Sequence, residues 1–191
     1  MPTINSTTDI STLSTADVSS LTPAQMSGLT TAQVVAFTTA QIPLLSPSKL
    51  NALSSAQFAV LDNADIAKIS ASDFSQLGSA AMMGMTTGQV DAITSAQAAR
   101  LTFAQLDKMT NIAALETADM VKVVATEFGS MSTAQLVNLS TAQAASLTVA
   151  QIAALSTAKF SQLAPEDLGA LNTSTFASLT NKQLVALTTA Q

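Results

Sequence analysis

The stretch LDNADIAKISASDF, residues 61–74, holds the three acids that come closest to a metal site. Asp62, Asp65 and Asp73 could bring three carboxylates to one edge of a helical segment, and carboxylate oxygens are the ligands that Ca²⁺ and Mg²⁺ prefer. The spacing matches neither an EF-hand loop nor a glycine-rich calcium-binding repeat. Asp62 has the place of a helix cap, and Asp65 has the place of the third residue of that helix. Asp73 has the place of the third residue in the next helix. We therefore predict that these three aspartates belong to helix caps and first turns and that they bind no metal.

Nucleophilic catalysis would need a serine activated by lysine, because the chain has no histidine and no cysteine. The stretch SPSKL offers Ser46, Ser48 and Lys49. Ser46 directly precedes a proline, which is the pattern of a helix cap followed by the first helical residue. The paired acids Glu116 with Asp119 and Glu166 with Asp167 also fit first-turn positions. With no glycine-rich phosphate loop either, the sequence predicts no active site, no cofactor and no small-molecule substrate.

The composition excludes further classes of function. Charged residues make up 10% of the 191 residues and the net charge is −5, against about 25% charged residues in ordinary soluble domains. No basic stripe is present to bind nucleic acid or an anionic bilayer. No apolar run reaches the roughly 20 residues that cross a membrane, and the start, MPTINSTTDIS, lacks the basic and apolar regions of a signal peptide.

A repeat of eight residues organises the chain from Asn5 onward. When each octad is numbered from 1 to 8 with Asn5 at position 1, a large apolar residue occupies position 1 in 23 of 24 units. One continuous helix is excluded, because each octad would rotate the apolar stripe by about 80°. Strands are disfavoured because positions 1 and 6, the two apolar positions, differ in parity. A fixed period of this kind predicts a repeat array.

One short helix in each octad explains every position. Position 2 is Ser, Thr, Asp, Asn or Gly in 21 of 24 units, as expected of an N-cap, and position 5 is Gln, Asp or Glu in 19 units, as expected of a capping box. Three prolines fall at position 3, the first helical residue. The caps we single out are Thr22, Thr30, Ser54, Ser132, Ser140 and Thr148.

Positions 1 and 6 then form a hydrophobic staple around each cap and supply the core. The core residues we single out are Leu21, Leu53, Phe58, Phe74, Leu139, Leu147, Phe160 and Phe176. We expect alanine at position 4 to let neighbouring helices approach closely, and positions 3, 5 and 7 to face solvent. Helices of about six residues need packing against neighbours, so the fold class is an all-α, rod-like solenoid. Phenylalanines at position 6 recur at multiples of 16 within each half, which suggests two octads per coil and leaves three open.

Two irregularities divide the array or expose its ends. The six-residue unit 109–114 should kink or rotate the stack, which gives a lead-in at 1–4, a first sub-array at 5–108 and a second at 115–191. Around it, Gly84 and Gly88 should add conformational freedom. An array without a polar terminal repeat exposes apolar surface, so we expect self-association, or continuation of a longer array, through the solenoid ends.

The octads LTTAQVVA, MSTAQLVN and LTVAQIAA resemble the Thr/Ala/Gln octapeptide arrays of large bacterial exoproteins described as adhesin- or haemagglutinin-like. The resemblance covers residues 5–191 and carries no catalytic or binding residues. It implies a secreted or cell-surface bacterial protein, exported without a cleaved N-terminal signal. We expect a non-enzymatic structural rod, self-assembling end to end into filaments or a surface layer. The alternative is an adhesion module whose side face recognises a glycan, a protein or ice. Threonine at position 3 in 11 of 24 units is the candidate row for ice.

Overall fold

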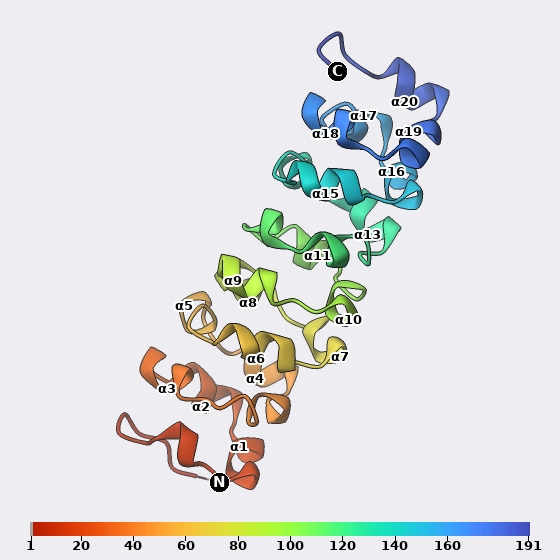
Figure 1. Cartoon of the computed structure of the whole chain (residues 1–191). Coiled ribbons are helices and arrows are strands. Elements are labelled where there is room, and N and C mark those ends of the chain that lie inside the picture. The colour runs from red at the N-terminus through yellow and green to blue at the C-terminus, as the bar shows by residue number, and fades with distance from the viewer. Residues whose placement is uncertain (1) are drawn as a thin grey trace.

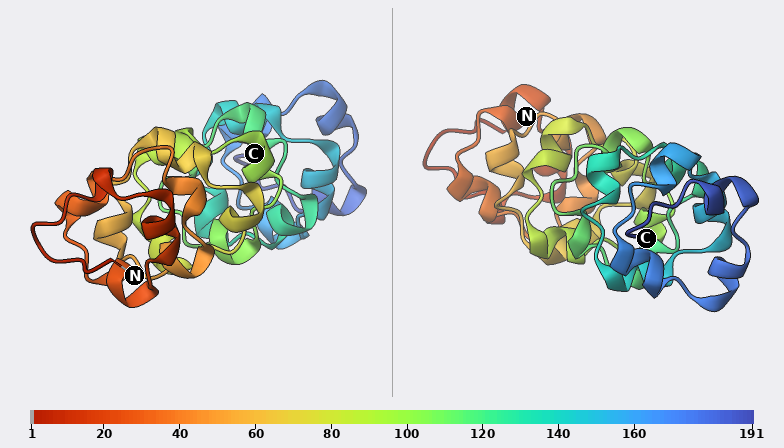
Figure 2. Two further views of the ribbon diagram at one scale, coloured as in Figure 1. Left: turned by 90° about the horizontal axis from the view of Figure 1, so that it is seen from below. Right: turned by 90° about the horizontal axis from the view of Figure 1, so that it is seen from above.

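Short helices follow one another along the whole chain, one in each unit from Asn5 to Ala186, and stack into an elongated rod (Figure 1). The computed structural model describes residues 2–191, and within this range the structure has helices and no strand. The helices are three to six residues long. The two ends of the chain lie at opposite ends of the rod (Figure 1), which Figure 2 shows from below and from above. The predicted solenoid of short helices is confirmed.

One coil of the solenoid contains three octads. The helices that pack against each other, such as α5 (Ser55–Phe58) with α8 (Ser79–Gly84) and α15 (Thr141–Ser146) with α18 (Pro165–Ala170), belong to units three octads apart. The suggestion of two octads per coil is therefore wrong. It relied on phenylalanine spacing, but position 6 points into one shared core from all three sides of the coil, so a phenylalanine on any side fills the same space.

The step of three octads sorts the helices into three columns, which we call faces A, B and C. Face A holds η1 (Ile10–Thr12), α3 (Thr31–Val35), α5, α8, α11 (Phe103–Leu106), α13 (Ala125–Ser130), α16 (Val149–Ala154) and α19 (Thr173–Ala177). Face B holds α1 (Thr15–Ser20), η2 (Ile42–Leu44), α6 (Asn63–Lys68), α9 (Thr87–Asp91), η3 (Ile112–Ala114), α14 (Thr133–Leu136), α17 (Thr157–Phe160) and α20 (Asn181–Val185). Face C holds α2 (Pro23–Ser27), α4 (Pro47–Leu50), α7 (Ala71–Phe74), α10 (Ser95–Ala98), α12 (Thr117–Met120), α15 and α18.

Residues of positions 1 and 6 form one continuous core along the rod axis. Of the core residues singled out from the sequence, seven are buried: Leu21, Leu53, Phe58, Phe74, Leu139, Leu147 and Phe160. Phe176 is the exception, with 49% of its surface exposed. It lies in the last coil, where no further coil packs over the core. The prediction that Phe176 lies in the closed core is therefore wrong.

Two assignments of octad positions are also wrong. Position 5 is buried, as Gln89 (0% exposed) and Gln97 (1%) show, whereas the alanines of position 4, such as Ala32 and Ala96, are exposed. Helix geometry explains both results. Residues advance by about 100° around a helix, so position 5 lies next to the buried position 6, and position 4 points almost directly away from the core. The solvent-facing positions are 3, 4 and 7.

Two glycines on face A lie close against the backbone of a neighbouring coil. A Cβ added at Gly84 would lie 2.4 Å from the Ser55 carbonyl oxygen, and one added at Gly129 would lie 2.5 Å from that of Ala154. The conformational freedom expected at Gly84 is thus a packing requirement. Both glycines leave room for the backbone of a neighbouring coil.

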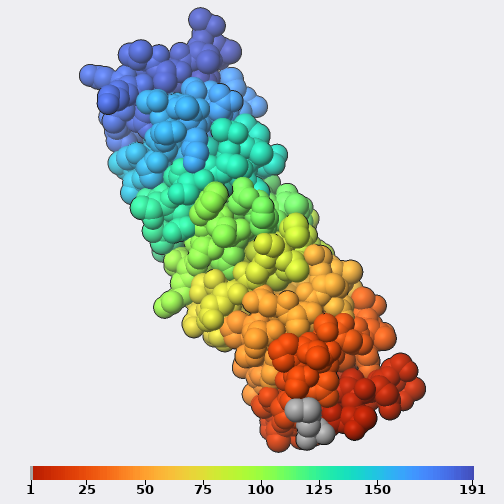
Figure 3. Space-filling model, turned by 180° about the vertical axis from the view of Figure 1, so that it is seen from behind, coloured from red at the N-terminus to blue at the C-terminus, as the bar shows by residue number. Residues whose placement is uncertain are grey.

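The stack continues through the short unit 109–114. This unit forms η3, which packs against α9 of the preceding coil, and α11 packs against α13 across it. The space-filling view shows successive segments of the chain as bands along one rod (Figure 3). No helix in residues 2–191 is long and apolar enough to cross a membrane.

Candidate functional site

The caps of the helices are the first half of the repeated site. The side-chain oxygens of the six caps singled out from the sequence accept the backbone N–H of the residue three positions later. These six are Thr22, Thr30, Ser54, Ser132, Ser140 and Thr148. In nine described helices the glutamine of position 5 completes the box by accepting the backbone N–H of the cap. Each box satisfies donors that the first turn of a helix leaves free.

The amide nitrogen of the same glutamine forms the second half of the site. Gln97 Nε2 donates to the carbonyl oxygens of Ile66 and Ile69, at 2.8 Å each, in the preceding coil. Gln143 does the same to Ile112 and Leu115, at 2.8 and 2.7 Å. The first carbonyl belongs to the last turn of a helix, and the second belongs to the C-cap residue that follows that helix. One side chain therefore satisfies the start of its own helix and the end of a helix one coil earlier.

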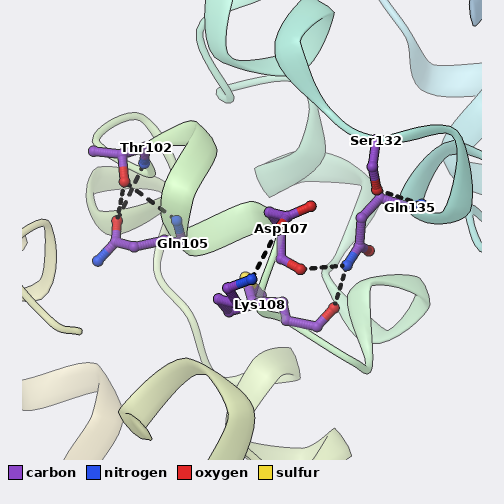
Figure 4. A network of polar contacts seen from close by, with 7 residues as sticks. Thr102, Gln105, Asp107, Lys108, Ser132 and Gln135 are labelled. Carbon is purple, nitrogen blue, oxygen red and sulfur yellow. Dashed lines mark hydrogen bonds and ion pairs between the residues drawn. The ribbon is translucent and has the colours of Figure 1, made fainter. Parts of the chain in front are cut away.

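All twelve glutamines at position 5 donate to an earlier backbone carbonyl in this way. Figure 4 shows two of them. Gln105 closes the box on Thr102, and Gln135 Nε2 lies between the carbonyls of Asp107 and Met109, at 3.2 and 3.0 Å. In six of the twelve the acceptors lie 28 and 31 residues earlier. For Gln135 they lie 28 and 26 residues earlier, because the short unit falls between.

A comparison with known families bears on this repeated unit. Residues 10–47 and 112–157 match the ALTTAQ repeat. The letters of that name appear in order at residues 186–191, where its glutamine is Gln191 at position 5. A comparison with curated proteins finds no match to the chain. The two ALTTAQ matches support a repeat array.

Two lysines and one threonine at position 5 of other octads donate as glutamine does. Lys49 Nζ donates to the carbonyls of Val18 and Ser19, at 3.2 and 2.6 Å, and Lys159 Nζ donates to that of Gly129 at 2.8 Å. Even the short Thr175 reaches the preceding coil, with Oγ1 3.1 Å from the Leu147 carbonyl oxygen. These residues share a side-chain hydrogen-bond donor. We call the hydrogen bonds that they and the glutamines of position 5 donate to the preceding coil the inter-coil hydrogen bonds.

Charge contributes little to the stack. Lys108 with Asp107, at 3.0 Å, is the single salt bridge within residues 2–191. Burial lowers the pKa of Lys49, whose ammonium group is held by backbone carbonyls rather than by a carboxylate.

The structure does not assemble the candidate chemical sites. No three Asp, Glu, His or Cys side chains within residues 2–191 are placed to hold a metal ion, so Asp62, Asp65 and Asp73 do not form a metal site. In the serine and lysine candidate, Ser46 Oγ and Ser48 Oγ lie 2.9 Å apart, while Lys49 donates to the preceding coil. Lys49 is therefore not available to activate either serine.

One pattern in the sequence indicates the inter-coil hydrogen bonds. A capping box alone does not explain this pattern. Glutamate and glutamine complete a capping box equally well, yet position 5 holds twelve glutamines and one glutamate, Glu127. Only the amide supplies a donor besides its acceptor. A preference for glutamine over glutamate at a box position thus indicates a carbonyl acceptor outside the helix.

Proposed function

We propose that the chain is a non-enzymatic structural segment, a stiff helical rod that spaces or assembles parts of a larger assembly. The observation that carries the proposal is the inter-coil hydrogen bond, which recurs from Gln25 to Gln191. Each coil is fixed to its neighbour by a shared core and by bonds directed along the rod. Such an array resists bending, because bending would stretch buried hydrogen bonds on one side.

The proposed setting is a secreted or cell-surface bacterial protein. What supports it is the resemblance of octads such as LTTAQVVA to arrays in adhesin-like exoproteins. A low content of charged residues and a surface of threonine, serine and alanine are compatible with a spacer whose side faces bind nothing strongly.

We further propose that the C-terminal end of the rod joins another coil of the same kind. Phe176 and Leu184, at position 6 of the last coil, are 49% and 43% exposed, and a cavity of about 110 Å³ is lined by Leu168, Leu179 and Leu187 beside Phe176. At the other end the equivalent residues are fully buried, among them Ile10 and Val18. Apolar surface was expected at both ends and is found at one. A second copy would cover it most simply by packing C-terminal end against C-terminal end.

Small-angle X-ray scattering and light scattering over a concentration series test both proposals. We expect a rod profile at low concentration and a shift toward twice the mass as concentration rises. Leu184→Glu should remain monomeric, because the charge would be buried in the joint. Val35→Glu, at an exposed apolar site on face A far from that end, is the matched control and should associate as the parent does.

A globular scattering profile would contradict the rod. Association that survives Leu184→Glu would contradict the joint. Long filaments would mean that the N-terminal coil also accepts a partner, as the sequence-based expectation of end-to-end assembly requires.

A second candidate function, adhesion through a side face, is favoured by one observation. Phe103, Val124 and Val149 are 40%, 47% and 42% exposed in three successive coils of face A, and clustered exposed apolar side chains are typical of interaction surfaces. Phe103→Ser should then abolish attachment to a surface or partner without changing the melting temperature. Unchanged attachment would exclude this face as the adhesive one.

A further inference from the structure

Asp65 takes the place of a glutamine in the interior of the stack. It lies at position 5 of α6 on face B and is 2% exposed. Its Oδ2 accepts the backbone N–H of Asp62 at 3.3 Å, which is half of a capping box. Its Oδ1 is buried and has no hydrogen-bond partner. A buried unpaired carboxylate oxygen is costly, so this group needs an explanation.

The repeat identifies what Oδ1 should face. Six of the glutamines donate to carbonyls 28 and 31 residues earlier, as Gln97 does, and for Asp65 these carbonyls belong to Phe37 and Val34. Helix α6 packs against η2 of that coil. Aspartate is shorter than glutamine, but Thr175 shows that a short side chain at this position reaches the preceding coil. An ionised Asp65 therefore presents an acceptor where the array requires a donor.

No cation compensates the charge. Helix η2 carries no titratable residue, and α9, which packs on the other side, carries only Asp91, which is exposed. On α6 itself Lys68 is exposed, and Asp62 adds a second negative charge. Burial has the largest effect on Asp65 and raises its pKa, while the backbone N–H of Asp62 lowers it. The Asp62 carboxylate raises the pKa, and the Thr39 hydroxyl of the preceding coil lies near enough to lower it but forms no hydrogen bond with Oδ1.

We propose that Asp65 is a proton-dependent contact between coils, in which the protonated carboxyl donates its O–H to a carbonyl of the preceding coil and ionisation removes that bond. The proton comes from solvent and returns to it. Acid thus completes the row of inter-coil hydrogen bonds on face B. At neutral pH the contact between α6 and η2 is the weak joint of the rod.

The direction of the change in stability with pH follows from the linkage between proton binding and folding. A carboxyl group whose pKa is higher in the folded chain than in the unfolded chain stabilises the fold fully below the unfolded value. This contribution is lost as the pH rises through the folded value. The parent protein should therefore lose stability relative to an Asp65→Asn variant between acidic and neutral pH, since asparagine keeps a donor at every pH.

Thermal unfolding of the parent and of Asp65→Asn, followed by circular dichroism from about pH 3 to pH 7.5, tests the proposal. We expect Asp65→Asn to melt roughly 3 °C higher at pH 7 and equally at the acidic end. Asp17→Asn is the matched control. Asp17 holds position 5 in the first coil, where it accepts a hydrogen bond from Ser14, so its substitution should give no stabilisation at neutral pH.

A second measurement does not depend on a variant. In a carbon-13 titration of the parent protein, the pKa of the Asp65 carboxyl should lie above the ordinary value of an aspartate. A difference in melting temperature that is constant with pH, a less stable Asp65→Asn at pH 7, or an Asp65 pKa at or below the ordinary value of an aspartate would each overturn the proposal.

Discussion

At the scale of single residues, glutamine at position 5 links the local code of the octad to the stack. Its oxygen accepts from its own cap and its nitrogen donates to the preceding coil, as in Gln151, which bonds Thr148, Met120 and Val123. The oxygen contact could be predicted from the sequence because both partners lie in one octad. The preference for glutamine indicates that the nitrogen has an acceptor outside the helix, but the identity of that acceptor could not be predicted, because it depends on the length of a coil, which no single octad encodes.

Removal of one such amide should lower the free energy of unfolding far more than removal of an exposed amide. We expect Gln97→Leu to lower the free energy of unfolding by about 2–4 kcal/mol, because it leaves the Ile69 carbonyl and the Thr94 N–H without partners. The Ile66 carbonyl would lose one of its two hydrogen bonds and keep the one from the Ile69 N–H. Gln162→Leu, at an exposed position 8, should change it by no more than about 0.5 kcal/mol. Urea unfolding measures both, and equal losses would contradict the role given to the amide.

At the scale of the helix, one octad contains all the residues that begin a helix and turn its apolar side toward the core. Cap, first turn, box and staple all lie within it, and this is why helix positions could be predicted without knowledge of the fold. The error concerned which side of each helix faces inward. Alanine at position 4, as in Ala96, suits a close contact, but the turn of the helix directs it outward and buries the neighbouring Gln97.

The octad frame predicts opposite outcomes for two aspartate substitutions. Leu147→Asp introduces a charge at a fully buried position 1 and should cost more than about 3 kcal/mol. Thr157→Asp adds an acid to the exposed first turn of α17 and should be neutral or slightly stabilising. Melting temperatures measured by circular dichroism compare them. Similar losses in both variants would show that the frame is wrong.

At the scale of the whole molecule, three octads close one coil and the coils stack along a common core. Phe58, Phe74 and Phe160 lie on faces A, C and B and are all buried in that core, so the spacing of aromatic residues could not reveal the number of octads per coil. The coil length depends on how three helices and their connections close around the side chains of positions 1 and 6. This is a property of the assembled structure rather than of any one repeat.

Disulfide formation between engineered cysteines tests the three-octad coil most directly, since the chain has no cysteine of its own. A Cβ added at Gly88 would lie 3.2 Å from Cγ of Asn63 on the preceding coil, so the pair Asn63→Cys with Gly88→Cys is close enough to oxidise. The pair Asn63→Cys with Ala80→Cys keeps the same octad positions at a spacing one octad shorter. The three-octad coil predicts an intramolecular disulfide in the first pair and none in the second, as measured by mass spectrometry after mild oxidation. A disulfide between positions 63 and 80, with free thiols at 63 and 88, would contradict it and establish two octads per coil.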